Sequence, residues 1–350
     1  MPYQGVSKGC YKTTDTIMTK KLMLSFMGLL GCALGLFAQS SQMATLTHGT
    51  TTTSYYGETA LSQAYDAATH GDVITLTGGT FPAVNIEKAI TLRGNGAIGD
   101  ANNGTLATVI SGEFNINIPS GTAYVTKIEG ISHSASGSGT IYINGNDGTD
   151  KIIILKSVLQ NVICIKCSPN FLQNNIYNLA TEYETNPCNI YASNCIIGRI
   201  SGYQDPTSFE VDHCTITSGA SIGGVVYKNC VIRLSSWTQS ISSNSSCHYC
   251  VGFYSENYGN VFKNVISTTC IDLSDDKNSF FEDGDRLGID CDYRLSETAA
   301  TTYLGDDGTQ VGAYGGNTPY NLTPTNPRIS TFSVSVTNNN NTLNVRLNVQ

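Results

Sequence analysis

A short phrase recurs at nearly constant spacing between Ser157 and Ser267. Counted at the residue after the Asn-like position, the steps are 18, 19, 19, 16, 20 and 15 residues. This period is too short for a repeat of two helices and too long for a heptad, and Asn followed by β-prone residues is typical of a parallel β-solenoid. The members are Ser157-Val158, Asn175-Ile176, Asn194-Cys195-Ile196, His213-Cys214-Thr215, Asn229-Cys230-Val231, Tyr249-Cys250-Val251 and Asn264-Val265-Ile266.

The remaining pattern predicts an all-β chain with capped ends. Apolar residues at helical spacing from Glu58 to Thr69 predict one short amphipathic helix that caps the first coil. Strand patterns follow from Asp72 onwards with no helix between them, as a β-helix requires. Beyond Pro319 two alternating segments around Asn338 predict a C-terminal β-hairpin extension. We therefore expect a leader at 1–38, a β-helix domain with its caps at 55–318, and a linker with the hairpin at 319–350.

The N-terminus has the features of an export signal. Lys20-Lys21 precedes an apolar stretch from Leu22 to Phe37, and Ala38 marks a cleavage region. We expect a secreted or outer-surface protein whose mature chain has no transmembrane helix. Leu29-Leu30-Gly31-Cys32 leaves open a lipoprotein anchored through Cys32. The formal net charge of -8 disfavours a nucleic-acid partner, because phosphate binding needs a basic surface.

Four of the twelve cysteines occupy equivalent places in successive repeats. Side chains stacked along a solenoid lie about 4.8 Å apart, which suits a disulfide poorly because its Cβ atoms are about 3.8 Å apart. We expect Cys195, Cys214, Cys230 and Cys250 to be buried free thiols. Two Cys-x-x-Cys pairs, at Cys164 and Cys247, are formally enough for zinc, but Cys250 already belongs to the interior column.

Two segments resemble a known group of proteins. The run from Ala60 through Gly71-Asp72-Val73-Ile74 to Phe81 is similar to the N-terminal cap and first coil of the pectin-lyase-like, right-handed parallel β-helix superfamily. Phe280-Phe281-Glu282-Asp283 and the stretch from Asp306 to Gly316 resemble the closing segment of bacterial surface β-helix proteins with an exchangeable-anchor domain. The resemblance implies a right-handed parallel β-helix, an extracellular life, commonly in Bacteroidota, and glycan-related roles. It carries no activity, because this fold supports lyases, hydrolases, adhesins and scaffolds.

One mixed-charge column is a candidate catalytic site. Two places before the repeat cysteine the residues are Ser193, Asp212, Lys228, His248 and Lys263, which become vertical neighbours in a coil. Asp212, Lys228 and His248 would supply acid, base and anion contact. The alternative that we favour is a solvated ladder of alternating charge on an exterior turn.

Two further groups are candidates for ligand binding. The acidic run from Asp272 to Asp292 offers oxygen ligands for Ca²⁺, with Asp283 and Asp285 as the candidate ligands. Because it lacks an EF-hand or nonapeptide spacing, the alternative that we favour is a solvated cap loop. No other cofactor is expected. Tyrosines in or beside the long turns of the repeat offer aromatic faces to sugar rings. They are Tyr177, Tyr183, Tyr191, Tyr203, Tyr254 and Tyr258.

The sequence thus favours an exported β-helix protein that binds a polysaccharide or cell-surface glycan. A polysaccharide lyase or glycoside hydrolase with an unrecognised site, and a structural or adhesive surface scaffold, remain as alternatives.

Overall fold

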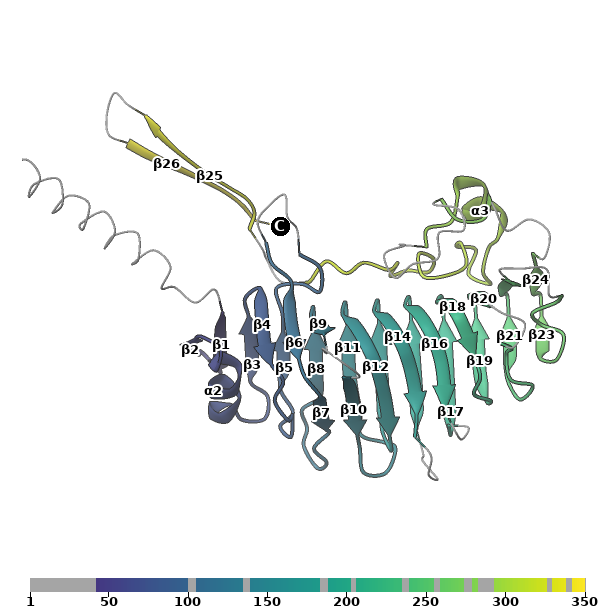
Figure 1. Cartoon of the computed structure of the whole chain (residues 1–350), viewed down its shortest axis with the longest axis horizontal. Coiled ribbons are helices and arrows are strands. Elements are labelled where there is room, and N and C mark those ends of the chain that lie inside the picture. The colour runs from purple at the N-terminus through teal and green to yellow at the C-terminus, as the bar shows by residue number, and fades with distance from the viewer. Residues whose placement is uncertain are drawn as a thin grey trace, which may run out of the picture. The chain divides into compact units, whose positions relative to one another are not determined.

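The computed structural model describes residues 42–349, apart from residues 100–104, 135–138, 183–187, 203–205, 235–238, 255–258, 274–278, 283–292, 326–328 and 338–341. The predicted leader at 1–38, including Cys32, lies outside the described residues. Within the described part the chain forms a parallel β-solenoid, as the repeat predicts (Figure 1).

Two long sheets form the walls of the solenoid. Each turn places a strand of sheet A before a strand of sheet B, and strands pair in parallel with their equivalents one turn later. Sheet A contains β1 (Met43–His48), β2 (Thr51–Tyr56), β3 (Val73–Leu76), β5 (Thr91–Arg93), β8 (Thr126–Glu129), β11 (Lys151–Leu155), β13 (Ser168–Leu172), β15 (Asn189–Ser193), β17 (Ser208–Asp212), β19 (Val225–Lys228), β21 (Ser246–His248) and β23 (Ile266–Thr268). Sheet B contains β4 (Gly79–Pro82), β6 (Thr108–Ser111), β7 (Phe114–Asn117), β9 (Ser132–Ser134), β10 (Thr140–Asn144), β12 (Val158–Ile165), β14 (Asn175–Thr181), β16 (Ile196–Gly202), β18 (Thr215–Ala220), β20 (Val231–Leu234), β22 (Val251–Tyr254) and β24 (Ile271–Asp272).

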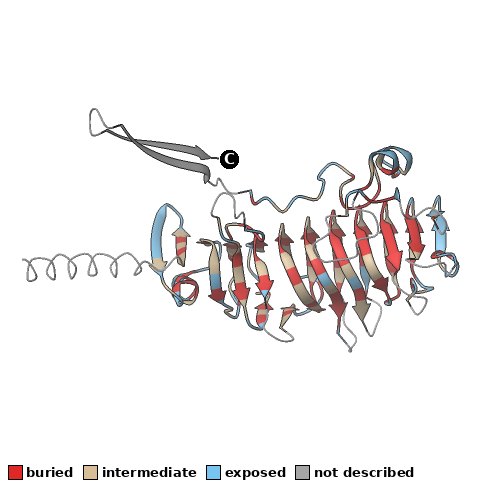
Figure 2. Cartoon of the chain, turned by 45° about the horizontal axis from the view of Figure 1, so that its top comes forward, coloured by how far each residue is buried: buried red, intermediate tan, exposed pale blue. Residues whose placement is uncertain are grey.

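The core lies between the two sheets, where alternate residues of each strand point inward (Figure 2). Because equivalent positions pair in register, apolar side chains form continuous rows along the solenoid. One row across sheet B joins Phe114, Ile141, Val162, Leu179 and Ile200, all of which are buried. Each turn thus buries its apolar residues against its neighbours, as expected for a solenoid.

The predicted capping helix is confirmed. Helix α2 (Ala60–Ala67) packs against β1, β2 and β3 and buries Ala60, Leu61, Ala64 and Tyr65. The Tyr65 hydroxyl accepts a hydrogen bond from the Glu87 amide at 2.5 Å, which ties the helix to the next turn. The β1–β2 hairpin, which the sequence analysis did not predict, adds to sheet A through antiparallel pairing of β1 with β3.

From β11 onwards, each turn from sheet A to sheet B passes through a non-glycine residue in the left-handed region. We call these residues the corner column: Lys156, Gln173, Asn194, His213, Asn229, Tyr249 and Thr269, with φ between 45° and 56°. Asn tolerates this conformation better than most residues, which explains its recurrence in the phrase. The column corrects the predicted repeat at three places. Lys156 and Gln173 hold the corner instead of Ser157 and Asn175, and Thr269-Cys270 replaces Asn264-Val265.

The predicted column of buried thiols is also confirmed. Cys195, Cys214, Cys230 and Cys250 are each 0% exposed and free. Their sulfur atoms accept backbone N–H groups of the preceding turn: Cys195 N–H donates to Cys214 Sγ at 3.3 Å, and Cys214 N–H to Cys230 Sγ at 3.5 Å. Ser157 and Asn174 have the same role in earlier turns. Ser157 Oγ accepts a hydrogen bond from the Ile131 N–H, and Asn174 Oδ1 accepts one from the Ser157 N–H. The thiols therefore complete a hydrogen-bond ladder as well as filling the core.

A second, smaller core lies on the outer side of β20 and β22. Val231, Val251 and Phe253 pack there against Phe280 and Phe281, and the rings of Phe253 and Phe280 are 5.4 Å apart. The short helix α3 (Glu297–Thr302) adds Ala299, and the side chain of Ser296 caps it by accepting the Ala299 N–H at 3.3 Å. This cluster fixes the start of the closing segment of the chain.

The C-terminal hairpin is present as predicted. Strands β25 (Ile329–Thr337) and β26 (Thr342–Val349) pair antiparallel in a two-stranded sheet of their own. Across the described residues, no helix has the length and apolar character needed to cross a membrane.

Candidate functional site

The predicted charge ladder exists as a row in sheet A. Asp212, Lys228 and His248 are in register on β17, β19 and β21, with Ser193 before them. The next position is Thr268, so the placement of Lys263 in this row is wrong. Lys228 Nζ donates to Glu210 Oε1 at 2.7 Å, and this hydrogen bond, opposed by partial burial, raises the pKa of Lys228. A catalytic role for the three residues stays a prediction.

The three candidate tyrosines that the structure describes do not form one cluster. Tyr177 is 56% exposed on the outer side of β14 in sheet B, and Tyr191 lies on β15 in sheet A. Tyr254 packs partly against the core, and its hydroxyl donates to the Gln239 carbonyl at 3.3 Å. Tyr183, Tyr203 and Tyr258 lie outside the described residues.

The metal candidates find no site in the described part of the chain. Asp283 and Asp285 lie outside it, and the residues inside it include no group of three or more His, Cys, Asp or Glu arranged to hold an ion. Cys164, Cys167, Cys247 and Cys250 are buried free thiols. Ca²⁺ therefore stays a prediction that rests on the sequence alone.

The closing segment forms a strap across the corner column. We use the name strap for residues 304–325, which run back along the solenoid towards its N-terminal turns (Figure 1). Asn229 Nδ2 donates to Asp306 Oδ1 at 2.8 Å, and Asn194 Nδ2 donates to the carbonyl of Gly315 at 2.8 Å. Further along, Gln173 donates to the Pro319 carbonyl and Lys156 Nζ to the Thr323 carbonyl at 2.7 Å. The corner side chains thus hold the strap along its length.

The far end of the strap is anchored by a buried carboxylate. Glu129 is 0% exposed and accepts the Thr325 N–H at 2.9 Å, with Arg93 and Lys127 within 3.6 Å and 3.4 Å. Burial opposes its ionisation, but the hydrogen bonds from Thr325 and the charge of Lys127 lower the pKa of Glu129 overall. The carboxylate is therefore ionised where it meets the strap.

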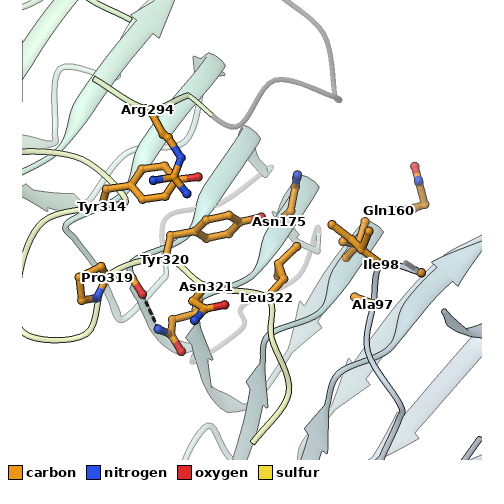
Figure 3. A pocket seen from close by; sticks show the side chains of 13 residues that line it. Ala97, Ile98, Gln160, Asn175, Arg294, Tyr314, Pro319, Tyr320, Asn321 and Leu322 are labelled. Atoms are coloured by element: carbon orange, nitrogen blue, oxygen red, sulfur yellow. Dashed lines mark hydrogen bonds between the residues drawn. The ribbon is translucent and has the colours of Figure 1, made fainter. Parts of the chain in front are cut away.

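A groove of about 1200 Å³ lies between the strap and the start of β12 and β14. Clefts that hold drug-sized ligands have roughly 300–1,000 Å³, so this groove has room for an oligomeric ligand. The sheet supplies Val158, Gln160 and Asn175, and the strap supplies Tyr314, Pro319, Tyr320, Asn321 and Leu322 (Figure 3). Residues 97–99, Gln173 and Arg294 complete the lining.

An aromatic and cationic stack forms one wall of this groove. The guanidinium carbon of Arg294 lies 4.6 Å from the centre of the Tyr314 ring, and the Tyr314 and Tyr320 rings meet edge to face at 5.5 Å. Cation–π and edge-to-face contacts of this geometry are attractive and fix the planes of the groups involved. In Figure 3 Tyr320 extends from the strap towards Asn175. Flat aromatic surface and amide groups therefore border the same space.

A second pocket of about 470 Å³ continues on the outer side of sheet B and shares Asn175 with the first. Tyr177, Asn178 and Arg199 line it from β14 and β16. A Cβ at Gly198 would lie 2.4 Å from the Tyr177 carbonyl oxygen, so only glycine fits beside this tyrosine. Among the described residues that line the two pockets, three are arginines, at 199, 233 and 294, and none is Asp or Glu.

Most residues of the groove and the second pocket were not predicted from the sequence. Tyr177 of the second pocket was a candidate, but Tyr314, Tyr320 and Arg294 were not, because they lie in irregular segments without periodicity. Gln173 and Pro319 meet across about 146 positions of sequence. The available signal was the pair Gly315-Gly316 beside Tyr314, since adjacent glycines indicate backbone packed closely against other groups.

Comparisons with family models, with curated proteins and with solved structures gave no match for this chain. The parallel β-solenoid is established by the structure itself, and the likeness to the pectin-lyase-like superfamily stays a resemblance in the sequence.

Proposed function

We propose that this protein is exported and that it binds a glycan chain in the groove between the strap and sheet B. The observation that carries the proposal is the stack of Arg294, Tyr314 and Tyr320 beside the amides of Gln160, Asn175 and Asn321. Sugar rings have apolar C–H faces and polar rims. They are therefore recognised by aromatic faces together with donors and acceptors placed around them.

The residue types of the groove match this chemistry. Asn and Gln side chains each offer a carbonyl acceptor and two N–H donors, which suits hydroxyl groups that also donate and accept. The second pocket extends the lined surface past Asn175 along β14 to Tyr177 and across to Arg199 on β16. An extended chain of sugars fits such a surface better than a single small molecule does.

The charge of the lining favours a glycan with acidic groups. The whole chain has a formal net charge of -8, yet the described lining of both pockets contains three arginines and no carboxylate. The planar guanidinium pairs well with carboxylate or sulfate oxygens. The charged residues of the described lining are therefore opposite in sign to the net charge of the chain.

Binding is supported better than hydrolysis. Glycoside hydrolysis uses a pair of carboxylic groups that flank the scissile bond, and the described lining residues of this groove include none. A lyase that uses an arginine base is the second candidate, because Arg199 and Arg294 line the pockets.

The test is a glycan-array screen of the purified protein, followed by calorimetric titration of the best oligosaccharide. Loss of one aromatic stacking surface costs about 0.5–1.5 kcal/mol, so Tyr320→Ala should weaken binding by about 2- to 13-fold. The matched control Tyr191→Ala removes a half-buried tyrosine from sheet A and should leave the affinity unchanged. Equal loss in both variants, or no binding to any array member, would contradict the proposal. New unsaturated uronide absorbance during the titration would establish the lyase instead.

A further inference from the structure

His213 occupies the corner column directly beneath the strap. It has φ of 45° and is 4% exposed. Its Nδ1 lies 3.0 Å from Asp212 Oδ1 on its own turn, and its Nε2 lies 3.4 Å from Asp307 Oδ2 of the strap. The ring thus stands between two carboxylates, one belonging to the coil and one to the strap.

The strap folds closely around this imidazole. A Cβ at Gly315 would lie 2.7 Å from ring carbon Cδ2 of His213, and one at Gly316 would lie 3.3 Å from Cγ, so both glycines present bare backbone to the ring. Thr309 Oγ1 lies 3.3 Å from Nε2 and accepts the Gly316 N–H at 2.6 Å. Residues 307–316 therefore form a loop that contacts the His213 ring through Asp307, Thr309, Gly315 and Gly316.

The charged groups around His213 are predominantly acidic. Asp212 and Asp307 contact the ring directly, and Asp306 is bound to the neighbouring corner residue Asn229. Lys228, which is in register with Asp212 on the next strand of sheet A, donates to Glu210. Burial opposes the charged imidazole, yet the hydrogen bonds and charges of Asp212 and Asp307 raise the pKa of His213 above its ordinary value of 6.5.

The loop around His213 leads directly into the groove. Tyr314 precedes Gly315-Gly316, and Asn194 holds the carbonyls of Ala313 and Gly315 at 3.1 Å and 2.8 Å. Movement of this loop away from the corner column would displace the Tyr314 ring and the stack it forms with Arg294 and Tyr320.

We propose that His213 is a pH-dependent latch for the glycan groove: its imidazolium bridges Asp212 and Asp307, holds the strap on the corner column and so keeps Tyr314 in place. The inference rests on the proposed function of the groove. His213 is a positioning residue in this scheme and does not contact the glycan.

The direction of the pH dependence follows from the pKa shifts of His213 and Asp307. The pKa of His213 is raised, so its contribution to strap docking is fully present below 6.5 and is lost as the pH rises through the raised value. Burial opposes ionisation of Asp307, but hydrogen bonds from Thr309 and the charge of His213 lower its pKa below 3.8. Its contribution is therefore lost only when the pH falls through that lower value. The strap is held most tightly between these two limits.

The first test follows the strap without any glycan. Amide exchange of Gly315 and Gly316, corrected for the intrinsic pH dependence of exchange, should be slower at about pH 6 than at about pH 8.5. Loss of one to two kcal/mol of docking energy corresponds to about a 5- to 30-fold change. His213→Asn is the decisive variant, because Asn occupies the equivalent corner at 194 and 229 and binds the strap there. It should keep the strap docked and abolish the pH dependence. His248→Asn, which changes a histidine on β21 of sheet A and not in the corner column, should retain it.

The second test measures glycan affinity at the same two pH values. The affinity should fall at the higher pH in the wild type and stay constant in His213→Asn. Flat exchange in the wild type, or pH dependence that persists in His213→Asn, would overturn the latch even if a glycan binds. Absence of glycan binding at both pH values would overturn the proposed function alone, since the exchange experiment does not depend on it.

Discussion

Two substitutions at Cys214 can show whether the buried thiols stabilise the solenoid by hydrogen bonding or only by filling the apolar core. Cys214 is 0% exposed, its sulfur accepts the Cys195 N–H at 3.3 Å, and its S–H donates to the Asp212 carbonyl at 3.3 Å. Cys214→Val keeps an apolar side chain of similar size but removes the acceptor. Cys214→Ser keeps both hydrogen bonds, as Ser157 already does in this column by accepting the Ile131 N–H and donating to the Leu155 carbonyl.

In Cys214→Val the Cys195 amide becomes a buried donor without a partner, which costs about 1–3 kcal/mol. Such a cost corresponds to about a 5- to 150-fold change in an equilibrium constant. Protection of the Cys195 amide from hydrogen exchange should therefore fall by this factor in Cys214→Val. In Cys214→Ser the loss should be smaller, about 1 kcal/mol, because mainly the packing of the larger sulfur is lost.

The assay is hydrogen exchange resolved to the Cys195 amide by NMR. Ile216→Val, on the strand that follows Cys214, serves as the control, because it removes one buried methylene and leaves the ladder intact. If the Cys195 amide were equally protected from exchange in Cys214→Val and in Cys214→Ser, the thiols would only fill the apolar core. That result would refute a hydrogen-bonding role for them.

Three other outcomes follow from the same contacts. Gly315→Ala would place its Cβ 1.7 Å from the Gln310 carbonyl oxygen, so we expect faster proteolysis of the strap and weaker glycan binding. The control Gly308→Asn, at a position with φ of 77° and open space around it, should change neither. Asn194→Ala removes the hydrogen bonds to the carbonyls of Ala313 and Gly315 and should weaken docking of the strap by about 1–2 kcal/mol. The Gly316 amide should then exchange faster than in the wild type, and an unchanged rate would contradict the role of the corner column. Among the nine described cysteines, the eight buried ones should resist a thiol reagent in the native protein and Cys270 should react first; peptide mapping checks this, and rapid labelling of Cys214 or Cys230 would contradict the buried column.

The solenoid was predictable because its signal is periodic. Equivalent thiols at Cys195, Cys214, Cys230 and Cys250 reveal the stacking of turns without any knowledge of the backbone. The predicted register failed at three corners, Lys156, Gln173 and Thr269, and none of these residues is Asn. Lys156 and Gln173 adopt the left-handed conformation although neither favours it, and the stacked turns on either side hold them there. Asn264-Val265 has the residue pattern of the repeat but lies in a turn before β23. For this reason the sequence predicted Lys263 as the last member of the charge ladder, whereas the structure has Thr268 at that position.

The groove was much less predictable, because its parts come from separate regions of the chain. Tyr314 and Tyr320 are placed by hydrogen bonds from Asn194 and Gln173 to backbone carbonyls of the strap, and such contacts leave no periodic trace in the sequence. The aromatic core of Phe253, Phe280 and Phe281 that fixes the start of the closing segment is likewise a tertiary feature. Tyr177 was found for its place beside a repeat turn, and it does border the second pocket.

A crystal structure of the protein with the best oligosaccharide from the array is the most direct test of glycan binding in the groove under the strap. We expect sugar rings packed against Tyr314 and Tyr320, with hydroxyl groups bonded to Asn175 or Asn321 and an acidic group at Arg294 or Arg199. Sugar density on the outer face of sheet A, around Tyr191 and the row of Asp212, Lys228 and His248, with the strap groove empty, would contradict it.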